Sequence, residues 1–375
     1  MVKILIIHTI PIREIKANLI QTLNMARSFV RGGADVEMAV INDDSSELFE
    51  EKLESIVDGI REFVNVENYK SRFDWLKPSE LARFISVYSV IKNTNRVIFT
   101  RSPYVVVAAN RLGKKVIYES HNSYFSKTSL LNRIFTNVFR VISFKENLLL
   151  FISISQNLSD YWKTKGINPN KLTALHDGVE LMPVREEEVS EVKNSFKDKL
   201  RFCYAGSLYA DRKPTRFIHL GKKFPQSEFV IVGGPDDIAH KLSQTCLNEG
   251  VNNVRFLGRI EHKKVRNELL KADVLLALWS KSVRTIEFCS PLKVFEYMEV
   301  EKLIIADGFT PIKEVLTHNV NSLLATPDDF ESLCNEIQKV HDNPTGLLGL
   351  GVGNRHLIRA KYSWDKRAKL ILEKL

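Results

Sequence analysis

The segment Ser290-Pro-Leu-Lys-Val-Phe-Glu-Tyr-Met298 carries the strongest chemical signal in the 375-residue chain. Serine is a favoured helix N-cap and proline is favoured at the first helical position, so the pattern predicts a helix starting at Pro291. The free backbone N–H groups of such a helix start can bind a diphosphate beside Lys293, and Glu296 can accept hydrogen bonds from ribose hydroxyls. The alternative is an ordinary capped surface helix that carries a lysine and a glutamate.

Two loops that contain glycine follow predicted strands in the second half of the chain. The first reads Ala205-Gly-Ser-Leu-Tyr-Ala-Asp-Arg-Lys213, and the second reads Val230-Ile-Val-Gly-Gly-Pro235. Gly206 would let the backbone approach a phosphate, and Lys213 could neutralise charge on a departing diphosphate. A solvated Arg-Lys turn explains the first loop equally well, and many purely structural strand exits resemble Gly233-Gly234.

A third candidate group follows strands in the first half of the chain. The segment Tyr118-Glu-Ser-His-Asn122 ends a predicted strand. His121 could contact a sugar hydroxyl or an acceptor, with Glu119 orienting its ring. Arg101 follows another predicted strand and is a weaker candidate for binding an anion. The alternative is a structural histidine that forms hydrogen bonds at a strand end.

Several well-known catalytic patterns are absent from the sequence. No Asp-x-Asp, no His-Glu-x-x-His and no closely spaced pair of histidines or cysteines occurs, so we expect a metal-independent mechanism without a cofactor. No G-x-S-x-G and no G-x-x-x-x-G-K-[ST] occurs either. Their absence argues against the usual serine hydrolases and P-loop enzymes.

Strand-like apolar runs alternate with helix-length segments along the whole chain. Strands are expected at 2–8, 36–41, 96–100, 115–119, 149–154 and 172–175, and again at 201–205, 228–232, 254–257, 274–278, 303–306 and 322–325. A strongly charged stretch from Met182 to Lys199 separates the two sets, which places a domain boundary near residue 185. The pattern predicts an α/β chain of two doubly wound, Rossmann-like domains, with the candidate residues at the carboxyl ends of strands.

The charge of the chain favours anionic partners. There are 54 Lys+Arg and 45 Asp+Glu, a formal net charge of +9, which suits nucleotides, phosphorylated lipids or a membrane surface. The basic residues are dispersed and form no nucleic-acid-binding motif, so nucleic acid is not an expected partner. The apolar runs fall far short of the about 20 residues that span a bilayer. We therefore expect a cytoplasmic protein.

Residues 127–147 form an amphipathic helical pattern with cationic flanks and a broad side of phenylalanine, leucine and isoleucine. Such a helix can lie on an anionic membrane surface. Packing of the helix on the sheet is the favoured interpretation, since most amphipathic helices pack in this way.

Taken together, these segments resemble family 4 of the retaining nucleotide-sugar glycosyltransferases, which have the two-domain GT-B fold. The resemblance covers nearly the whole chain. It is carried by Ile152-Ser-Ile-Ser155, Asp177-Gly-Val-Glu180, Tyr204-Ala-Gly, Val232-Gly-Gly-Pro, Phe256-Leu-Gly-Arg-Ile260, Ser290 to Met298 and Tyr362-Ser-Trp364. It implies an acceptor-binding domain at 1–185, a donor-binding domain at 186–355 across a cleft, and a C-terminal helix at 356–375 that crosses back to the first domain.

The resemblance also implies roles for individual residues. Glu296 matches the second glutamate of the family's E-x7-E motif, which binds the donor ribose, and Arg259-Ile260 lie where the base is held. The implied catalytic residues are His121, Lys213 and Glu287, with Arg101 and Glu119 on the acceptor side. The implied nucleotide-sugar-binding residues are Gly206, Ser207, Arg212, Lys213, Gly233, Gly234, Arg259, Ile260, Ser290, Pro291, Leu292, Lys293 and Glu296.

Two positions depart from the family pattern. Phe288 stands at the place of the first motif glutamate, with Glu287 one residue earlier, and Ser207 stands where an arginine is common. The predicted function is a metal-independent retaining glycosyltransferase that moves a sugar from a nucleoside-diphosphate sugar to a lipid-linked, polysaccharide or other glycan acceptor. The alternatives are a nucleotide-sugar epimerase, a sugar phosphorylase, or a non-catalytic nucleotide-sugar-binding protein.

Overall fold

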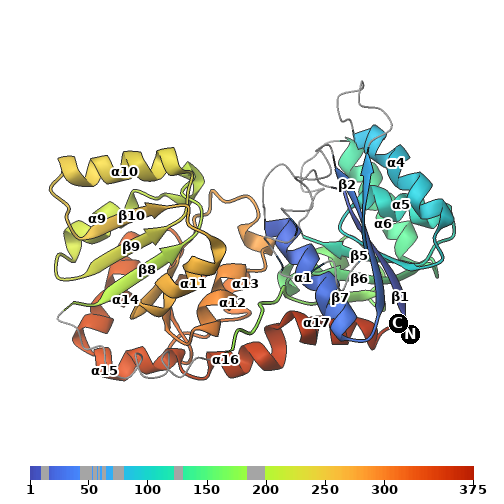
Figure 1. Cartoon of the computed structure of the whole chain (residues 1–375). Coiled ribbons are helices and arrows are strands. Elements are labelled where there is room, and N and C mark those ends of the chain that lie inside the picture. The colour runs from blue at the N-terminus through green and yellow to red at the C-terminus, as the bar shows by residue number, and fades with distance from the viewer. Residues whose placement is uncertain are drawn as a thin grey trace. The chain divides into compact units, whose positions relative to one another are not determined.

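A computed structural model of the chain describes residues 1–9, 17–42, 53, 57, 60, 65–70, 80–121, 130–183 and 199–375. The chain forms two compact units, Met1–Glu180 together with Ser363–Leu375, and Leu181–Tyr362. The sequence predicts domain boundaries at 185 and 356. In the structure the chain passes from the first unit to the second after Glu180 and returns to the first unit at Ser363. The predicted α/β class with two doubly wound domains is confirmed (Figure 1).

The first unit contains a parallel sheet in the order β3-β2-β1-β4-β5-β6-β7. Its last helix comes from the far end of the chain and packs against α1, where Ser28 donates a 2.6 Å hydrogen bond to Asp365. Its strands are β1 (Lys3–His8), β2 (Asp35–Asn42), β3 (Asn65–Lys70), β4 (Val97–Thr100), β5 (Val116–Ser120), β6 (Leu148–Ser153) and β7 (Leu172–Ala174). Its helices are α1 (Ala17–Arg31), α4 (Glu80–Asn93), α5 (Pro103–Arg111), α6 (Leu130–Ser143), α7 (Gln156–Thr164) and α17 (Trp364–Leu372).

The second unit contains a parallel sheet in the order β10-β9-β8-β11-β12-β13. Its strands are β8 (Arg201–Ala205), β9 (Glu228–Val232), β10 (Val254–Gly258), β11 (Val274–Ala277), β12 (Leu303–Asp307) and β13 (Leu323–Ala325). Its α-helices are α9 (Arg216–Lys223), α10 (Asp236–Asn248), α11 (His262–Leu270), α12 (Leu292–Glu299), α13 (Thr310–Lys313), α14 (Phe330–Asp342), α15 (Pro344–Leu347) and α16 (Asn354–Leu357). Short 3-10 turns lie at Ala210–Arg212, Ile286–Phe288 and Leu348–Gly351, and Ile358–Tyr362 form a π-helical turn.

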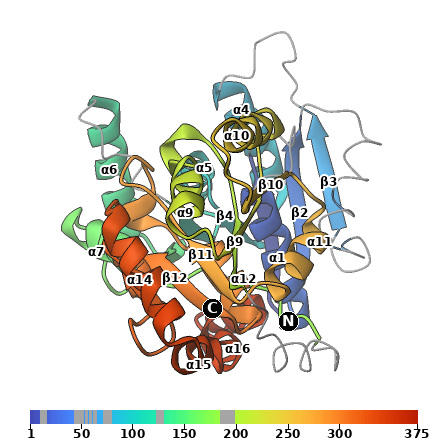
Figure 2. The ribbon, with the colours of Figure 1, turned by 90° about the vertical axis from the view of Figure 1, so that its left-hand side faces the viewer.

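The core of the second unit explains why its strands read as continuous apolar runs. Buried side chains of α9, α10 and α14 pack on one face of the sheet against residues such as Phe202 and Ile305. Helix α11 packs against β8, and helix α12 packs against β11. Figure 2 shows α14 and α11 on opposite sides of this sheet. A strand that is covered on both faces must be apolar at successive positions.

The start of α12 differs from the sequence prediction by one residue. Pro291 is the N-cap, with a non-helical φ of −85° and ψ of 81°, and the first helical residue is Leu292. The N–H of Leu292 bonds to the carbonyl of Ser290 at 3.0 Å, so the chain turns tightly before the helix begins. Ser290 is therefore outside the helix, and the predicted serine N-cap is wrong.

Helix α6 covers most of the amphipathic segment predicted at 127–147. Residues 127–129 lie outside the described residues, and the described side chains of the helix begin at Thr136. Phe139 and Ile142 are buried, so one side of the helix packs on the unit, whereas Val141 and Phe144 are 56% and 64% exposed. In the described part of the chain, no helix is long and apolar enough to cross a membrane.

Candidate functional site

Two glycines bring the carboxyl ends of β8 and β9 together. The N–H of Gly206 donates to the carbonyl of Val232 at 2.9 Å. At Gly233 the backbone has a φ of +133°, and an added Cβ would lie 1.8 Å from the carbonyl oxygen of Gly206. Only glycine permits this approach. The predicted glycine loops therefore meet at the sheet edge where doubly wound folds bind ligands.

Lys293 of α12 reaches the same place. Its Nζ lies 4.1 Å from the ring centroid of Tyr204 and 4.9 Å from that of Trp279. A Cβ added to Gly206 would lie 2.6 Å from this nitrogen, so the amine is directly beside the glycine backbone. Burial, together with the charge of Arg212, lowers the pKa of Lys293 to about 7. An anion bound at these strand ends would meet a lysine amine that has few competing partners of opposite charge.

Lys213 lies at the exposed side of the site. It follows the 3-10 turn Ala210–Arg212 with a φ of +51°. Its side chain is half exposed, and its Nζ lies 2.7 Å from a carboxylate oxygen of Asp328. The same aspartate accepts a hydrogen bond from the N–H of Lys281 at 2.8 Å. A ligand phosphate would have to share Lys213 with Asp328, a modest cost because exposed ion pairs contribute about 1 kcal/mol or less.

A buried ion pair, missed from the sequence, holds the loop after β8 in place. Arg216 in the first turn of α9 donates to Asp307 at the end of β12 (3.2 Å) and to the carbonyls of Arg212 (2.9 Å) and Trp279 (2.6 Å). Asp307 also accepts from the N–H of Trp279 at 2.7 Å. Burial raises the pKa of Asp307 to about 6, although the Arg216 charge opposes this. Arg216 and Asp307 therefore join the ends of β8, β11 and β12.

Helix α12 is fixed to the sheet by Tyr297. Its hydroxyl accepts a 2.7 Å hydrogen bond from the N–H of Ala205, the last residue of β8. Glu296 and Lys293 are three residues apart on this helix and both are partly buried. The remaining predicted residues of this region differ in exposure, because Leu292, Ser290, Ser207 and Arg212 are partly buried whereas Glu287 is exposed.

The loops after β9 and β10 form the outer part of the site. A Cβ added to Gly234 would lie 2.8 Å from Cγ of Arg259, so that side chain lies across the glycine. The N–H of Arg259 donates to Asp236 at 2.7 Å, which ties the start of α10 to the end of β10. Ile260 beside it is partly exposed. The structure therefore brings together Gly234 and Arg259, two residues that the resemblance assigns to nucleotide binding.

His121 in the first unit uses both of its ring nitrogens. Its Nδ1 lies 2.5 Å from a guanidinium nitrogen of Arg101, and its Nε2 bonds the carboxylate of Glu119. Arginine only donates, so Nδ1 accepts and Nε2 carries the proton that is donated to Glu119. Burial and the charge of Arg101 lower the pKa of His121, which favours this neutral form. Arg101, Glu119 and His121, all named from the sequence, form one cluster.

Arg367 of α17 completes this cluster, although nothing in the sequence marked it. It is 2% exposed, and its guanidinium lies 2.7 Å from the second carboxylate oxygen of Glu119, which is 3% exposed. Burial alone would raise the pKa of Glu119, but the charge of Arg367 and the hydrogen bond from His121 hold it well below its usual range. Asp177 lies beside them and accepts from Gln21 at 2.6 Å. Its pKa is raised by burial.

The spacing of this cluster would suit a metal ion, but its charges are already balanced. Ligand atoms of Glu119, His121 and Asp177 lie within 4.8 Å of one another. However, Arg101 and Arg367 contact the same groups. A cation would therefore have to displace or oppose two arginines.

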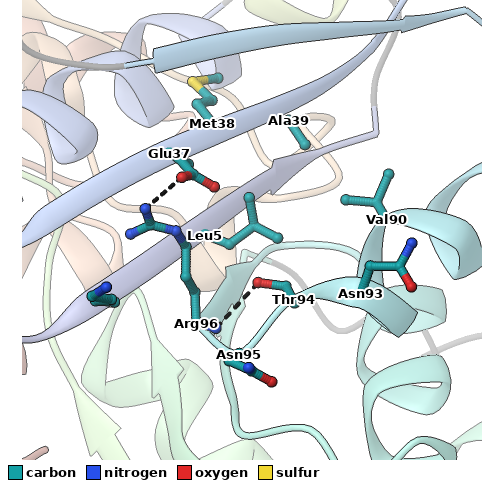
Figure 3. A pocket seen from close by; sticks show the side chains of 10 residues that line it. Leu5, Glu37, Met38, Ala39, Val90, Asn93, Thr94, Asn95 and Arg96 are labelled. Carbon is teal, nitrogen blue, oxygen red and sulfur yellow. Dashed lines mark hydrogen bonds and ion pairs between the residues drawn. The ribbon is translucent and has the colours of Figure 1, made fainter.

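A hollow of about 340 Å³ lies elsewhere in the first unit. Figure 3 shows Arg96 beside it, bonded to Glu37 of β2 and, through its backbone N–H, to Thr94 at 3.1 Å. It opens at the amino ends of β1 and β4, opposite to the edge where doubly wound sheets bind ligands. We assign no chemistry to it.

Comparison with known proteins agrees with this geometry. Residues 185–351 match the family model described as Glycosyl transferases group 1. The chain is 21% identical over 266 residues to the uncharacterized glycosyltransferase MJ1069 of Methanocaldococcus jannaschii, a match that covers 68% of this chain and 66% of that protein.

Solved structures show the same fold over the full length. HepE (Alr3699) of Anabaena, in complex with UDP and glucose, superposes with a TM-score of 0.73 at 16% identity and covers 100% of both chains. The lipopolysaccharide outer core galactosyltransferase WaaB in its apo form gives a TM-score of 0.71 at 14% identity, again over 100% of both chains. The second unit thus resembles the family described as Glycosyl transferases group 1, and the chain has the two-domain fold of these solved glycosyltransferase structures.

Proposed function

We propose that the chain is a retaining, metal-independent glycosyltransferase that uses a nucleoside-diphosphate sugar as donor. The observation that carries the proposal is the convergence of Gly206, Gly233 and Lys293 at the carboxyl edge of the second unit. This edge lies within the group 1 match at 185–351. HepE binds UDP and glucose, which supports UDP as the first nucleotide to test.

In the proposed reaction, the donor diphosphate rests between the glycine backbones and α12. The bond between the anomeric carbon and the β-phosphate oxygen breaks, and its electron pair goes to that oxygen. Lys293 and Lys213 stabilise the charge that develops there, which is the main electrostatic requirement of such a step. An acceptor hydroxyl adds to the anomeric carbon from the same face, and its proton passes to the departing phosphate oxygen.

His121 is proposed to act on the acceptor side. In the structure it is a neutral ring held by Arg101 and Glu119, with its proton on Nε2. A sugar hydroxyl could bond to it only by replacing one of these two partners. Its proposed contribution is therefore to orient a hydroxyl rather than to remove a proton.

A thermal-shift screen of UDP, GDP, ADP and their glucose conjugates tests the donor site. A ligand that binds only the folded state raises the unfolding temperature. We expect one nucleotide to stabilise the chain, with the shift reduced in Lys213→Ala and Glu296→Ala. Lys222→Ala is the matched control, because that half-exposed lysine pairs with Glu249 on the same unit, away from the strand ends. No shift with any nucleotide would contradict the proposed donor site.

The acceptor is proposed to be a lipid-linked, polysaccharide or other glycan, reached from the cytoplasmic face of a membrane. Val141 and Phe144 are largely exposed at the end of α6, and Arg140 and Lys145 beside them are also exposed. This combination of apolar and cationic side chains suits an anionic lipid surface. The lipopolysaccharide outer core galactosyltransferase WaaB shares the fold.

Co-sedimentation with vesicles tests the membrane contact. We expect binding to vesicles that contain phosphatidylglycerol and little binding to pure phosphatidylcholine, with Val141→Ser/Phe144→Ser reducing it. Val320→Ser is the control, since Val320 is 66% exposed in the other unit. Equal, negligible binding to both kinds of vesicle would contradict the proposal.

A further inference from the structure

Lys293 lies in surroundings that are unusual for a lysine proposed to bind an anionic ligand. Tyr204 and Trp279, whose rings flank its amine, are only 2% and 5% exposed. The Gly206 backbone lies directly beside the amine, and the lysine as a whole is partly buried. Ring faces attract an ammonium group, but rings and backbone together also exclude the water that would solvate it. The balance between these effects depends on the charges nearby.

The charges that face Lys293 come from four elements. Arg212 of the 3-10 turn and Arg216 of α9 are positive, whereas Glu296 of α12 and Asp307 of β12 are negative. The phenol of Tyr204 stays neutral, because burial raises its pKa to about 12. Two positive and two negative groups therefore balance when the lysine is neutral. A protonated lysine adds an excess positive charge, in agreement with the lowered pKa.

We propose that binding of a nucleotide sugar is coupled to the uptake of a proton at Lys293, so that the amine becomes charged only as the diphosphate arrives beside it. The inference rests on the proposed donor site. The diphosphate brings two negative charges to a group that is balanced without it, and it thereby favours the ammonium form. Ser207 stands at the place where the family often has a permanently charged arginine, and Lys293 is a titratable cation directly beside the Gly206 backbone.

The coupling predicts that donor affinity falls as the pH rises through neutrality. If the free amine has a pKa of about 7 and the bound one titrates well above 8, the apparent dissociation constant should rise about fivefold between pH 7 and pH 8. A permanently charged side chain should abolish this slope. Lys293→Arg should therefore bind the donor with nearly the same affinity at both pH values.

Competitive labelling of the wild-type chain with acetic anhydride, followed by mass spectrometry, tests the free state. Each lysine becomes reactive as it loses its proton, so the labelling profile between pH 5.5 and 10 gives its midpoint. We expect Lys293 to be half reactive near pH 7. Lys222 and Lys264, 50% and 63% exposed on the same unit, serve as the reference lysines in the same experiment. A Lys293 profile that coincides with theirs overturns the inference.

The bound state is tested by calorimetry with UDP-glucose, whose diphosphate does not itself titrate near neutrality. Measuring the binding heat at pH 7 in buffers of different ionisation enthalpy gives the number of protons taken up. We expect about half a proton for the wild type and for Lys222→Arg, and none for Lys293→Arg. Binding without uptake overturns the inference alone. Failure of UDP-, GDP- and ADP-glucose to bind at all would refute both the inference and the proposed function.

Discussion

Replacing Arg367 by methionine should destabilise the first unit strongly, although this residue lies only eight positions before the last residue of the sequence. Its guanidinium is 2.7 Å from Glu119, and both side chains are almost completely buried. The substitution leaves the carboxylate in place without its principal partner. Removing one member of a buried ion pair costs about 3–5 kcal/mol, because the remaining charge is desolvated and uncompensated.

The matched control is Arg31→Met on α1. Arg31 also pairs with acidic residues, Glu180 and Asp365, but its side chain is 45% exposed. Exposed pairs contribute about 1 kcal/mol or less. The two variants each remove one arginine charge from the same unit. The difference between their losses of opening free energy therefore reports the effect of burial. Adding Glu119→Gln to Arg367→Met should recover part of the loss, since a neutral amide is less costly to bury than a carboxylate.

Hydrogen exchange of the β5 and β6 amides is the appropriate assay. Exchange reports the opening free energy of each unit separately, so it isolates the effect of the substitution on the first unit. At pH 7 we expect the opening free energy to fall by about 3–5 kcal/mol in Arg367→Met. A loss no larger than that of Arg31→Met would refute the assignment of Arg367 as the buried partner of Glu119.

The pH dependence provides a second check on the same pair. The pKa of Glu119 is lowered in the folded wild type, so its ionised form adds stability at neutral pH. This stability is lost as the pH falls through the folded pKa. Without Arg367, burial should raise the pKa of Glu119, and the ionised form then destabilises the unit. The difference in opening free energy between Arg367→Met and the wild type should therefore decrease as the pH falls from 7 to 4.

Three further substitutions test the donor site. Lys293→Met should raise the unfolding temperature of the unliganded chain at pH 6, because the lowered pKa of Lys293 means that its charged form is unfavourable in the folded state. The same substitution should reduce the increase in unfolding temperature that a nucleotide sugar causes. Gly233→Ala should destabilise the second unit by several kcal/mol in urea unfolding, since the new Cβ would meet a carbonyl oxygen at 1.8 Å. Gly250→Ala is the control: this glycine also has a positive φ, but nothing lies within 4 Å of the added Cβ, so the cost should be only about 1–2 kcal/mol. Tyr297→Phe should cost about 1–3 kcal/mol in the same assay, because it removes the acceptor of the buried Ala205 N–H. An unchanged urea midpoint in either Gly233→Ala or Tyr297→Phe would contradict the corresponding contact.

The sequence predicted the strand order along the chain but missed one strand. The predicted strands were apolar runs, which buried parallel strands require. Strand β3 (Asn65–Lys70) reads Asn-Val-Glu-Asn-Tyr-Lys and pairs only with β2 at the sheet edge. A polar edge strand carries no such run, so its pattern resembles a loop. The start of α12 was wrong by one residue for a local reason, the tight turn at Ser290.

Candidate site residues were recognisable where a short contiguous motif carried them. Gly206, Gly233 and His121 each come just after a strand, and Lys293 and Glu296 share one helix start. Their residue types and the carboxyl-end rule for doubly wound sheets were enough to select them. The roles assigned to them remain predictions.

What the sequence determined by itself was the alternation of strands and helices, and hence the edge of each sheet at which ligand-binding residues gather. Only the tertiary structure decided which side chains support them. Arg216 bonds the carbonyl of Trp279, 63 positions away, and Arg367 bonds Glu119, 248 positions away. Such pairs have no local signature, because burial and partner geometry arise only when distant segments pack together. For the same reason, the charge state of Lys293 depends on two rings and four charged groups from separate elements.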